Sequence, residues 1–292
     1  MNWHSPLSPY LPSYDGLPLN EGGLQFVFMS LHSTVPCLSV VMPAYNEEKT
    51  LAKVVEKLLR LPQLHEVVIV DDCSSDETPH IANSLAAQHR SVRVVRHSSN
   101  RGKTRALKTG VQQTTGAIVL VQDADLEYDP EDIPGLIQPI VDGYADVVYG
   151  SRFLVRKAAR VLYFHHYLAN RALTFLSNLF TNINLTDVET GYKAFRGDLI
   201  REMIIMSKGF GFEIEVTAKI AKLKCAIFEA PISYYGRTYE EGKKIRPSDG
   251  FAAVWYVIRF NLFCRREASF RRLPALAREV RGGRSSPFDV EG

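Results

Sequence analysis

The fold is decided by the stretch Val119-Leu120-Val121-Gln122-Asp123-Ala124-Asp125-Leu126-Glu127, in which an apolar run ends in three carboxylates at alternate positions. A continuous apolar run is typical of a buried parallel strand. Ligands of open α/β sheets bind beyond the carboxyl ends of such strands, and a hard divalent cation takes carboxylate and phosphate oxygens there. We therefore expect a metal and phosphate site at this strand end. An isolated Asp-x-Asp is more often a solvated acidic turn, so the prediction depends on the neighbouring strand ends.

The other strands predicted in the first half also lead into polar segments. The predicted strands cover residues 38–42, 67–70, 92–95, 117–122 and 145–149. The segments that follow include Pro43-Ala44-Tyr45-Asn46-Glu47, Asp71-Asp72-Cys73-Ser74, Asn100-Arg101-Gly102-Lys103 and Gly150-Ser151-Arg152. Apolar residues at helical spacing lie between these strands. Alternating strands and helices imply right-handed crossovers and a mostly parallel sheet, which brings the polar segments to one edge.

The second half has a less regular pattern. It predicts a helix over 156–182, a polar turn over 187–193, a helix from about 209 to 223, a strand over 226–235, a charged loop over 236–244 and an aromatic helix over 251–263. We expect one α/β domain over residues 37–245. A poorly ordered lead (1–36) would precede it, and an amphipathic helix with a basic tail (246–292) would follow it.

Composition and charge are those of an ordinary globular protein. The chain has 292 residues, 46% of them hydrophobic and 23% charged, with a formal net charge of +3, so the overall charge does not indicate a nucleic-acid partner. The segment from Arg259 to Arg284 holds eight arginines and two glutamates. Such a basic segment is typical of a protein that meets anionic lipid or phosphates, and equally of a solubilising tail.

Cysteine usage and hydropathy indicate a reducing compartment and no membrane span. The four cysteines form no Cys-x-x-Cys pair, which argues against a zinc site or a disulfide framework. The longest apolar candidate, 251–264, is shorter than the roughly 20 residues that cross a bilayer, and it contains Arg259. No cationic segment precedes an apolar core near residue 1, so no signal peptide is expected. A start at Met29 is a hypothesis that N-terminal mass analysis would test.

Several enzyme classes lack their motifs in this sequence. There is no Gly-x-Gly-x-x-Gly after the first strand, no P-loop and no Gly-x-Ser-x-Gly, which argues against dinucleotide oxidoreductases, P-loop NTPases and α/β hydrolases. The adjacent His165 and His166 do not have the spacing of a helical metal pair. The loop 43–47 lacks the glycines and basic residues expected of a nucleotidyltransferase.

Together these motifs resemble those of family 2 glycosyltransferases of the GT-A fold. The resemblance rests on Pro43–Glu47, Val70–Ser74, Asn100–Lys103, Asp123–Glu127 and Gly150–Arg152, and it covers roughly residues 37–245. Their order and spacing are similar to the dolichyl-phosphate mannose synthase branch and its bacterial polyprenyl-phosphate relatives. The resemblance implies a GT-A α/β fold with a mostly parallel central sheet flanked by helices. It also implies an inverting transfer from a nucleotide-diphosphate sugar, with Mg²⁺ or Mn²⁺, to a lipid phosphate at the cytoplasmic membrane face.

The resemblance also implies roles for particular residues. The residues expected to bind the nucleotide-sugar are Pro43, Tyr45, Glu47, Val70, Asp72, Lys103, Asp123 and Ala124. Asp123 and Asp125 are the expected metal ligands, and Glu127, where the branch often has Gln, is a possible third. Arg152, Arg171, Arg237 and Lys243 are expected to bind the acceptor phosphate and the diphosphate. Asp125, Arg152 and Asp187 are the expected catalytic residues, Asp187 as a base only if the acceptor is a hydroxyl.

Three questions stay open at this stage. A transferase with a sugar-hydroxyl acceptor is the alternative enzyme, and a non-catalytic nucleotide-sugar-binding protein is the alternative class. A binding module has little need of a metal on a leaving group, so the intact Asp123 and Asp125 argue against the second. Asp72 accepts an N–H from uracil or guanine alike, which leaves GDP-mannose and UDP-hexoses as donors. Because the expected acceptor is a lipid, the helix 251–263 is expected to lie at the membrane surface, unless it only packs in the core.

Overall fold

The computed structural model describes residues 36–154, 163–236, 247–274 and 276. The strands are β1 (Leu38–Ala44), β2 (Leu64–Asp71), β3 (Val92–Arg96), β4 (Ile118–Val121), β5 (Val147–Ser151), β6 (Lys193–Arg196) and β7 (Ile227–Pro231). The helices are α1 (Leu51–Leu58), α2 (Thr78–Gln88), α3 (Lys103–Gln113), α4 (Ile133–Val141), α5 (Phe164–Thr181), α6 (Gly197–Glu202), α7 (Phe212–Leu223) and α8 (Pro247–Leu262), with short 3-10 helices at Pro130–Asp132 and Glu267–Ser269.

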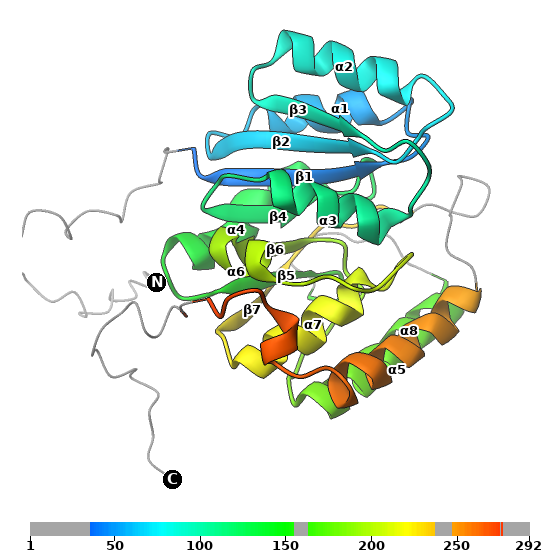
Figure 1. Cartoon of the computed structure of the whole chain (residues 1–292), viewed down its shortest axis with the longest axis vertical. Coiled ribbons are helices and arrows are strands. Elements are labelled where there is room, and N and C mark those ends of the chain that lie inside the picture. Colours follow the sequence, from blue (N-terminus) through cyan, green and yellow to red (C-terminus); the bar gives the residue numbers. More distant parts are fainter. Residues whose placement is uncertain (1–35, 155–162, 237–246, 275, 277–292) are drawn as a thin grey trace, which may run out of the picture. The chain divides into compact units, whose positions relative to one another are not determined.

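The strands form one sheet in the order β3-β2-β1-β4-β6-β5-β7 (Figure 1). Pairing is parallel except at β6, which runs antiparallel to both β4 and β5. Two antiparallel pairings in succession leave β5 parallel to β4. The carboxyl ends of β1, β2, β4 and β5 therefore lie along one edge, as the sequence predicted.

The sheet is buried on both faces because its strands alternate apolar side chains between two cores. Val40 and Met42 of β1 belong to the core under α1, α2 and α4. Val41, between them, belongs to the core under α3, α6 and α7. This period of two is the pleat of a strand, and it explains why the strands have continuous apolar sequences.

Helix α7 lies in the centre of the second core. Ten of its twelve residues are buried, including Glu215 and Lys219, which form an i, i+4 ion pair. Both α5 and α8 pack against α7 and against each other. Ala253 and Val257 of α8 are part of the same core, so this predicted amphipathic helix buries one of its faces in the domain.

The structure differs from the predicted elements in several places. Strand β6 and helix α6 were missed, because the sequence indicated only a polar turn over 187–193. The helix predicted over 156–182 runs from Phe164 to Thr181 in the described part, and residues 155–162 lie outside it. Of the predicted lead (1–36), only Pro36 belongs to the described residues. Across the described residues, no helix combines the length and the hydropathy needed to cross a bilayer.

Candidate active site

Hydrogen bonds join the loops after β1 and β2 into one edge. The backbone N–H of Asn46 donates to Ser74 Oγ at 3.0 Å, and that of Glu47 donates to Thr78 Oγ1 at 2.8 Å. In return, the N–H of Ser75 donates to Asn46 Oδ1 at 2.9 Å. Tyr45 lies on this edge and is 39% exposed. Of the predicted nucleoside contacts, Pro43 lies in β1, and Tyr45 and Glu47 lie in the loop that these hydrogen bonds hold.

Asp72 is buried and holds the loop that opens α3. Its carboxylate accepts hydrogen bonds from the N–H of Arg101 at 2.9 and 3.0 Å and from the N–H of Gly102 at 2.7 Å. His97 Nδ1 lies 2.7 Å from Asp72 Oδ1. Gly102 has a φ of +82°, a conformation that L side chains rarely adopt. In this structure Asp72 therefore positions the segment that carries Lys103. Val70, two residues before Asp72, is buried in β2.

Lys103 lies between two carboxylates from distant parts of the chain. Its Nζ is 2.9 Å from Asp123 Oδ1 and 3.3 Å from Glu213 Oε1. Burial alone would lower the pKa of Lys103, but Asp123 and Glu213 raise it well above its usual value. The ammonium therefore stays charged beside the acidic motif, where it suits an anionic ligand.

Asp123 and Asp125 follow β4, with the buried Ala124 between them, as the sequence predicted. Asp125 Oδ1 accepts a hydrogen bond from the N–H of Glu127 at 3.1 Å, which fixes the turn. Glu127 Oε2 accepts a hydrogen bond from the hydroxyl of Tyr234 at 2.8 Å. Within the described ranges, no three His, Cys, Asp or Glu side chains gather closely enough to hold a metal ion.

Asp123 and Asp125 fit a divalent cation as carboxylate ligands, and the role of Glu127 as a third ligand stays a prediction. Asp123 faces an ammonium in the structure, so its carboxylate is already oriented toward a cation. Glu213 Oε2, close by, is buried and has no hydrogen-bond partner, which adds negative potential to the same region. Two aspartates leave coordination positions open for the phosphates of a donor.

Arg152, just after β5, and Asp187, in the segment between α5 and β6, form a buried ion pair. Arg152 Nε and Nη2 donate to Asp187 Oδ2 and Oδ1 at 2.6 and 2.7 Å. Burial alone would raise the pKa of Asp187, but Arg152 lowers it below its usual value. The guanidinium also lies over the ring of Tyr234, 5.0 Å from the centroid. Asp187 is therefore an ionised anchor for Arg152.

Of the other predicted acceptor residues, only Arg171 is described. Its Nη1 donates to the carbonyl of Thr186 at 3.3 Å, beside Asp187, and its guanidinium lies 5.7 Å from the centroid of Phe153. It thus lies in the same region as Arg152. Arg237 and Lys243 lie outside the described residues.

Sequence reasoning missed three charged residues that the fold buries beside this site. Lys193 donates to the carbonyls of Val188 and Thr190, which fixes the turn that carries Asp187. Burial and the neighbouring Glu213 raise the pKa of Glu189 to about 7. The third residue is Glu213, the partner of Lys103. Its sequence signal is that Glu213 and Glu215 alternate with the apolar residues Phe212, Ile214 and Val216.

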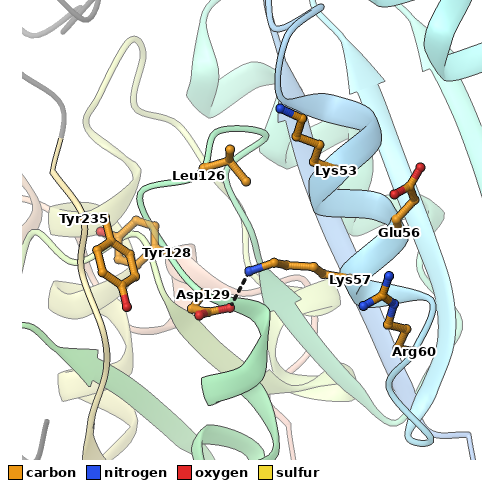
Figure 2. Close-up of a pocket in the computed structure, with 8 residues that line it drawn as sticks. All are labelled: Lys53, Glu56, Lys57, Arg60, Leu126, Tyr128, Asp129 and Tyr235. Carbon is orange, nitrogen blue, oxygen red and sulfur yellow. Dashed lines mark hydrogen bonds and ion pairs between the residues drawn. The ribbon is translucent and has the colours of Figure 1, made fainter.

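A pocket of about 390 Å³ lies next to the acidic motif. Figure 2 shows that Lys53 and Lys57 of α1, with Arg60 just after the helix, line one side and that Lys57 points to Asp129. Lys57 Nζ lies 3.1 Å from Asp129 Oδ1. None of the predicted site residues is among the residues that line it. The predicted site therefore lies along the sheet edge and not in this pocket.

A sheet with one antiparallel strand, and with an Asp-x-Asp pair, a lysine and a paired arginine along its carboxyl edge, defines the GT-A class of glycosyltransferases. The profile described as "Glycosyl transferase family 2" matches residues 39–204, more than half of the chain. The chain belongs to that family. The predicted fold and family are thereby confirmed, whereas the roles of individual residues stay predictions.

The chain is also similar in sequence to individual proteins with named activities. The chain is 32% identical over 239 residues to the undecaprenyl-phosphate mannosyltransferase of Micrococcus luteus, which covers 80% of this chain and 97% of that protein. It is 28% identical over 228 residues to the polyprenol monophosphomannose synthase of Mycolicibacterium smegmatis, covering 74% of this chain and 85% of the relative.

Solved structures of glucosyl-3-phosphoglycerate synthase from Mycobacterium tuberculosis have the same fold. The complex with UDP superposes with a TM-score of 0.61 at 22% identity, covering 77% of this chain and 80% of that chain. The complex with Mn²⁺, UDP and phosphoglyceric acid has a TM-score of 0.58 at 22% identity, covering 77% of each chain. At this identity the likeness concerns the fold alone.

Proposed function

We propose that the chain transfers a sugar from a nucleotide-diphosphate sugar to a polyprenyl phosphate, with inversion at the anomeric carbon. The pair formed by Arg152 and Asp187 carries this proposal. A hydroxyl acceptor needs a base, and Asp187 is ionised but fully engaged by an arginine. A phosphate monoester needs no base, because its second pKa of about 6 leaves it largely ionised at pH 7. The names of the Micrococcus and Mycolicibacterium relatives support the same acceptor class.

The donor's nucleoside is assigned to the edge formed by the loops after β1 and β2. Pro43 at the end of β1 would contact the nucleoside together with Tyr45 and Glu47 in the loop after it. Val70 at the end of β2 and Asp72 just after that strand would contact it from the other side. Because hydrogen bonds already hold these two loops together, they should lose little conformational entropy when the nucleotide binds. Tyr45, which is exposed there, suits stacking against a base, whereas Asp72 would meet it only by sharing a carboxylate that already accepts backbone hydrogen bonds.

The diphosphate is assigned to Lys103 and the Asp-x-Asp motif. A bound Mg²⁺ or Mn²⁺ would neutralise charge on the departing diphosphate. Asp123 and Asp125 would hold this ion, and Ala124 would lie against the ribose. Glu127 suits the role of a third ligand less well, because its carboxylate accepts a hydrogen bond from Tyr234. Lys103 would meet the diphosphate beside the metal, since its ammonium already lies against Asp123.

The acceptor phosphate is assigned to Arg152 and Arg171, with Arg237 and Lys243 as further predicted contacts. Arginine binds phosphate oxygens through a planar fork of N–H donors. Because Arg152 binds Asp187 through Nε and Nη2, its Nη1 would be the nitrogen that donates to the acceptor. Alignment of an ionised phosphate with the anomeric carbon is then the main contribution of the protein. We place this activity at the cytoplasmic face of a membrane, where the protein would bind peripherally.

A sugar-hydroxyl acceptor is the second candidate, and one observation favours it. Glu189 is a buried carboxyl with a pKa of about 7, the value that suits a general base near neutral pH. The two acceptors are separated by supplying one labelled donor with either a polyprenyl phosphate or the corresponding polyprenol. Transfer to the phosphate alone supports the leading proposal. Transfer to the alcohol, lost in Glu189→Gln, would replace it.

A further inference from the structure

Helix α5 exposes one row of its apolar side chains, whereas Leu173 and Leu176 pack against the second core. Its fully described buried residues are Thr174 and Ser177, both polar. The exposed apolar side chains include Phe164, Leu168, Phe175 and Leu179, the last two 70% and 68% exposed. Steps of four, seven and four residues place these on one stripe of the helix. An apolar stripe normally faces the core, so its exposure here calls for a partner.

Hydrogen bonds fix α5 in this orientation. The side chain of Asn178 donates to the carbonyl of Leu185 at 2.7 Å and accepts from its N–H at 3.2 Å. The N–H of Val188 donates to Thr174 Oγ1 at 3.2 Å. These bonds tie the inner, polar face of α5 to the segment that contains Asp187. The outward apolar stripe is therefore held in place, and Arg171, one of the predicted acceptor residues, lies along it between Leu168 and Phe175.

Helix α8 presents a second stripe beside the first. Phe251, Trp255 and Leu262 are exposed, the first two to 81% and 54%, and their spacing of four and seven residues puts them on one side of the helix. The opposite side buries Val257 and Phe260. Figure 1 shows α8 alongside α5, and both helices pack inward against α7. Both stripes therefore face away from the core.

The charges around these stripes are of one sign. No aspartate or glutamate occurs in 163–181 or in 250–266. Exposed basic side chains border the apolar stripes: His165, Arg171, Arg259, Arg265 and Arg266. A basic side chain close to an anionic bilayer contributes about 1 kcal/mol. Apolar stripes with a tryptophan and a cationic border are the composition of helices that lie in a membrane interface.

We propose that the exposed stripes of α5 and α8 form one docking surface for an anionic lipid bilayer. This surface comprises Phe164, Leu168, Phe175, Leu179, Phe251, Trp255 and Leu262, with the arginines around it. The inference deepens the proposed function, because a polyprenyl phosphate is reached only at a bilayer. A second copy of the chain fits less well, since a two-fold interface would bring together two copies of one patch that carries only positive charge. Docking through α5 would also bring the Arg152 and Asp187 region, tied to its inner face, close to the lipid headgroups.

Vesicle flotation of the full chain tests this surface. The probes are vesicles of phosphatidylcholine alone and vesicles of equal parts phosphatidylcholine and phosphatidylglycerol. The test variant is Phe175→Ser with Leu179→Ser, which removes two exposed side chains without opening the core. Tyr144→Ser is the matched control, because Tyr144 is 58% exposed and lies between α4 and β5. A third variant, Arg265→Gln with Arg266→Gln, tests the charge.

The wild type and the Tyr144 variant should float with the anionic vesicles and float less with phosphatidylcholine alone. The serine double variant should lose roughly tenfold or more in partitioning, since two large apolar side chains no longer enter the interface. The arginine variant should lose roughly fivefold per arginine on anionic vesicles only. Transfer to a long-chain polyprenyl phosphate in vesicles should fall with flotation, while transfer to a short-chain, water-soluble isoprenyl phosphate should not.

Other results would overturn the docking surface. If the wild type did not float with anionic vesicles, the docking surface would be wrong. It would also be wrong if light scattering showed a dimer that the serine double variant converts to a monomer, because the stripes would then bind a second copy of the chain. Equal loss of transfer to the short-chain acceptor would show that the two side chains act inside the fold. If flotation behaves as expected but no polyprenyl phosphate is ever glycosylated, the docking surface stands and the proposed function fails.

Discussion

Arg152 and Asp187 meet through two parallel hydrogen bonds of 2.6 and 2.7 Å, although 35 positions separate them in the chain. The N–H of Arg152 also donates to Asp187 at 3.2 Å, so the carboxylate holds both the backbone and the side chain of the arginine. Such a pair fixes the direction of the remaining guanidinium N–H groups. Under the proposed function, we expect Asp187 to position Arg152 rather than to take a proton.

Replacing Asp187 should damage stability and acceptor binding together. In Asp187→Asn the buried guanidinium loses its counter-charge, which should cost about 3–5 kcal/mol in the free energy of unfolding. The KM for the acceptor should rise, while metal-dependent hydrolysis of the donor should change little. Urea denaturation and steady-state kinetics measure the two effects. Asp198→Asn is the control, because Asp198 is an exposed partner of Arg196 and should cost less than about 1 kcal/mol.

A double variant separates stability from activity at this pair. Arg152→Gln with Asp187→Asn removes both charges, so it should unfold at higher urea concentrations than Asp187→Asn alone. It should nevertheless transfer no better, since no guanidinium is left for the acceptor. A double variant as unstable as the single one would show that the pairing contributes nothing.

Replacing Lys103 should weaken donor binding. In Lys103→Gln the carboxylates of Asp123 and Glu213 lose the ammonium between them, and a diphosphate loses a cationic contact. We expect the donor KM to rise roughly tenfold, the effect of losing about 1.4 kcal/mol in binding. Arg105→Gln, an exposed position on the same helix, should leave the donor KM unchanged. Titration with donor and metal checks this, and equal effects of both substitutions would refute the assignment.

Glu189 should make stability fall as the pH rises. Its pKa is raised from 4.5 to about 7, so the folded state keeps a proton that the unfolded state has lost. The contribution is therefore fully present below about pH 4.5 and is lost as the pH rises through about 7. Urea unfolding at about pH 5 and pH 7.5 should show that Glu189→Gln removes this loss. The pKa of Asp187 is lowered, so its contribution to the free energy of unfolding changes only at pH values below that range. A variant with the same pH slope as the wild type would mean that Glu189 is ionised throughout.

The sequence predicts the regular part of the fold well, because local pattern and tertiary burial agree there. The apolar runs over 38–42 and 67–70 become β1 and β2, and the polar residues after them reach the expected edge. Strand β6 was missed because it has four residues and begins with Lys193, a charged side chain that the fold buries. The position of β6 between β4 and β5 depends on pairing with strands far away in the sequence, which a local sequence pattern does not predict.

The site is predictable where it follows strands and unpredictable where distant segments meet. Asp123 and Asp125 were found from their place after β4. The partners of Lys103 and Arg152 come from α7 and from the turn before β6, so the sequence alone does not reveal them. The same holds for α5, where composition predicted a helix but did not indicate that its apolar stripe lies outside.

Transfer of radiolabelled sugar into an organic-extractable lipid tests the central claim most directly. Purified protein would receive a polyprenyl phosphate, Mg²⁺ or Mn²⁺, and in turn each of a set of UDP- and GDP-sugars. Label should enter the lipid with one donor, and both EDTA and Asp125→Asn should abolish this transfer. Metal-dependent hydrolysis of a donor with no labelled lipid from any of them would contradict the account and favour a hydroxyl acceptor.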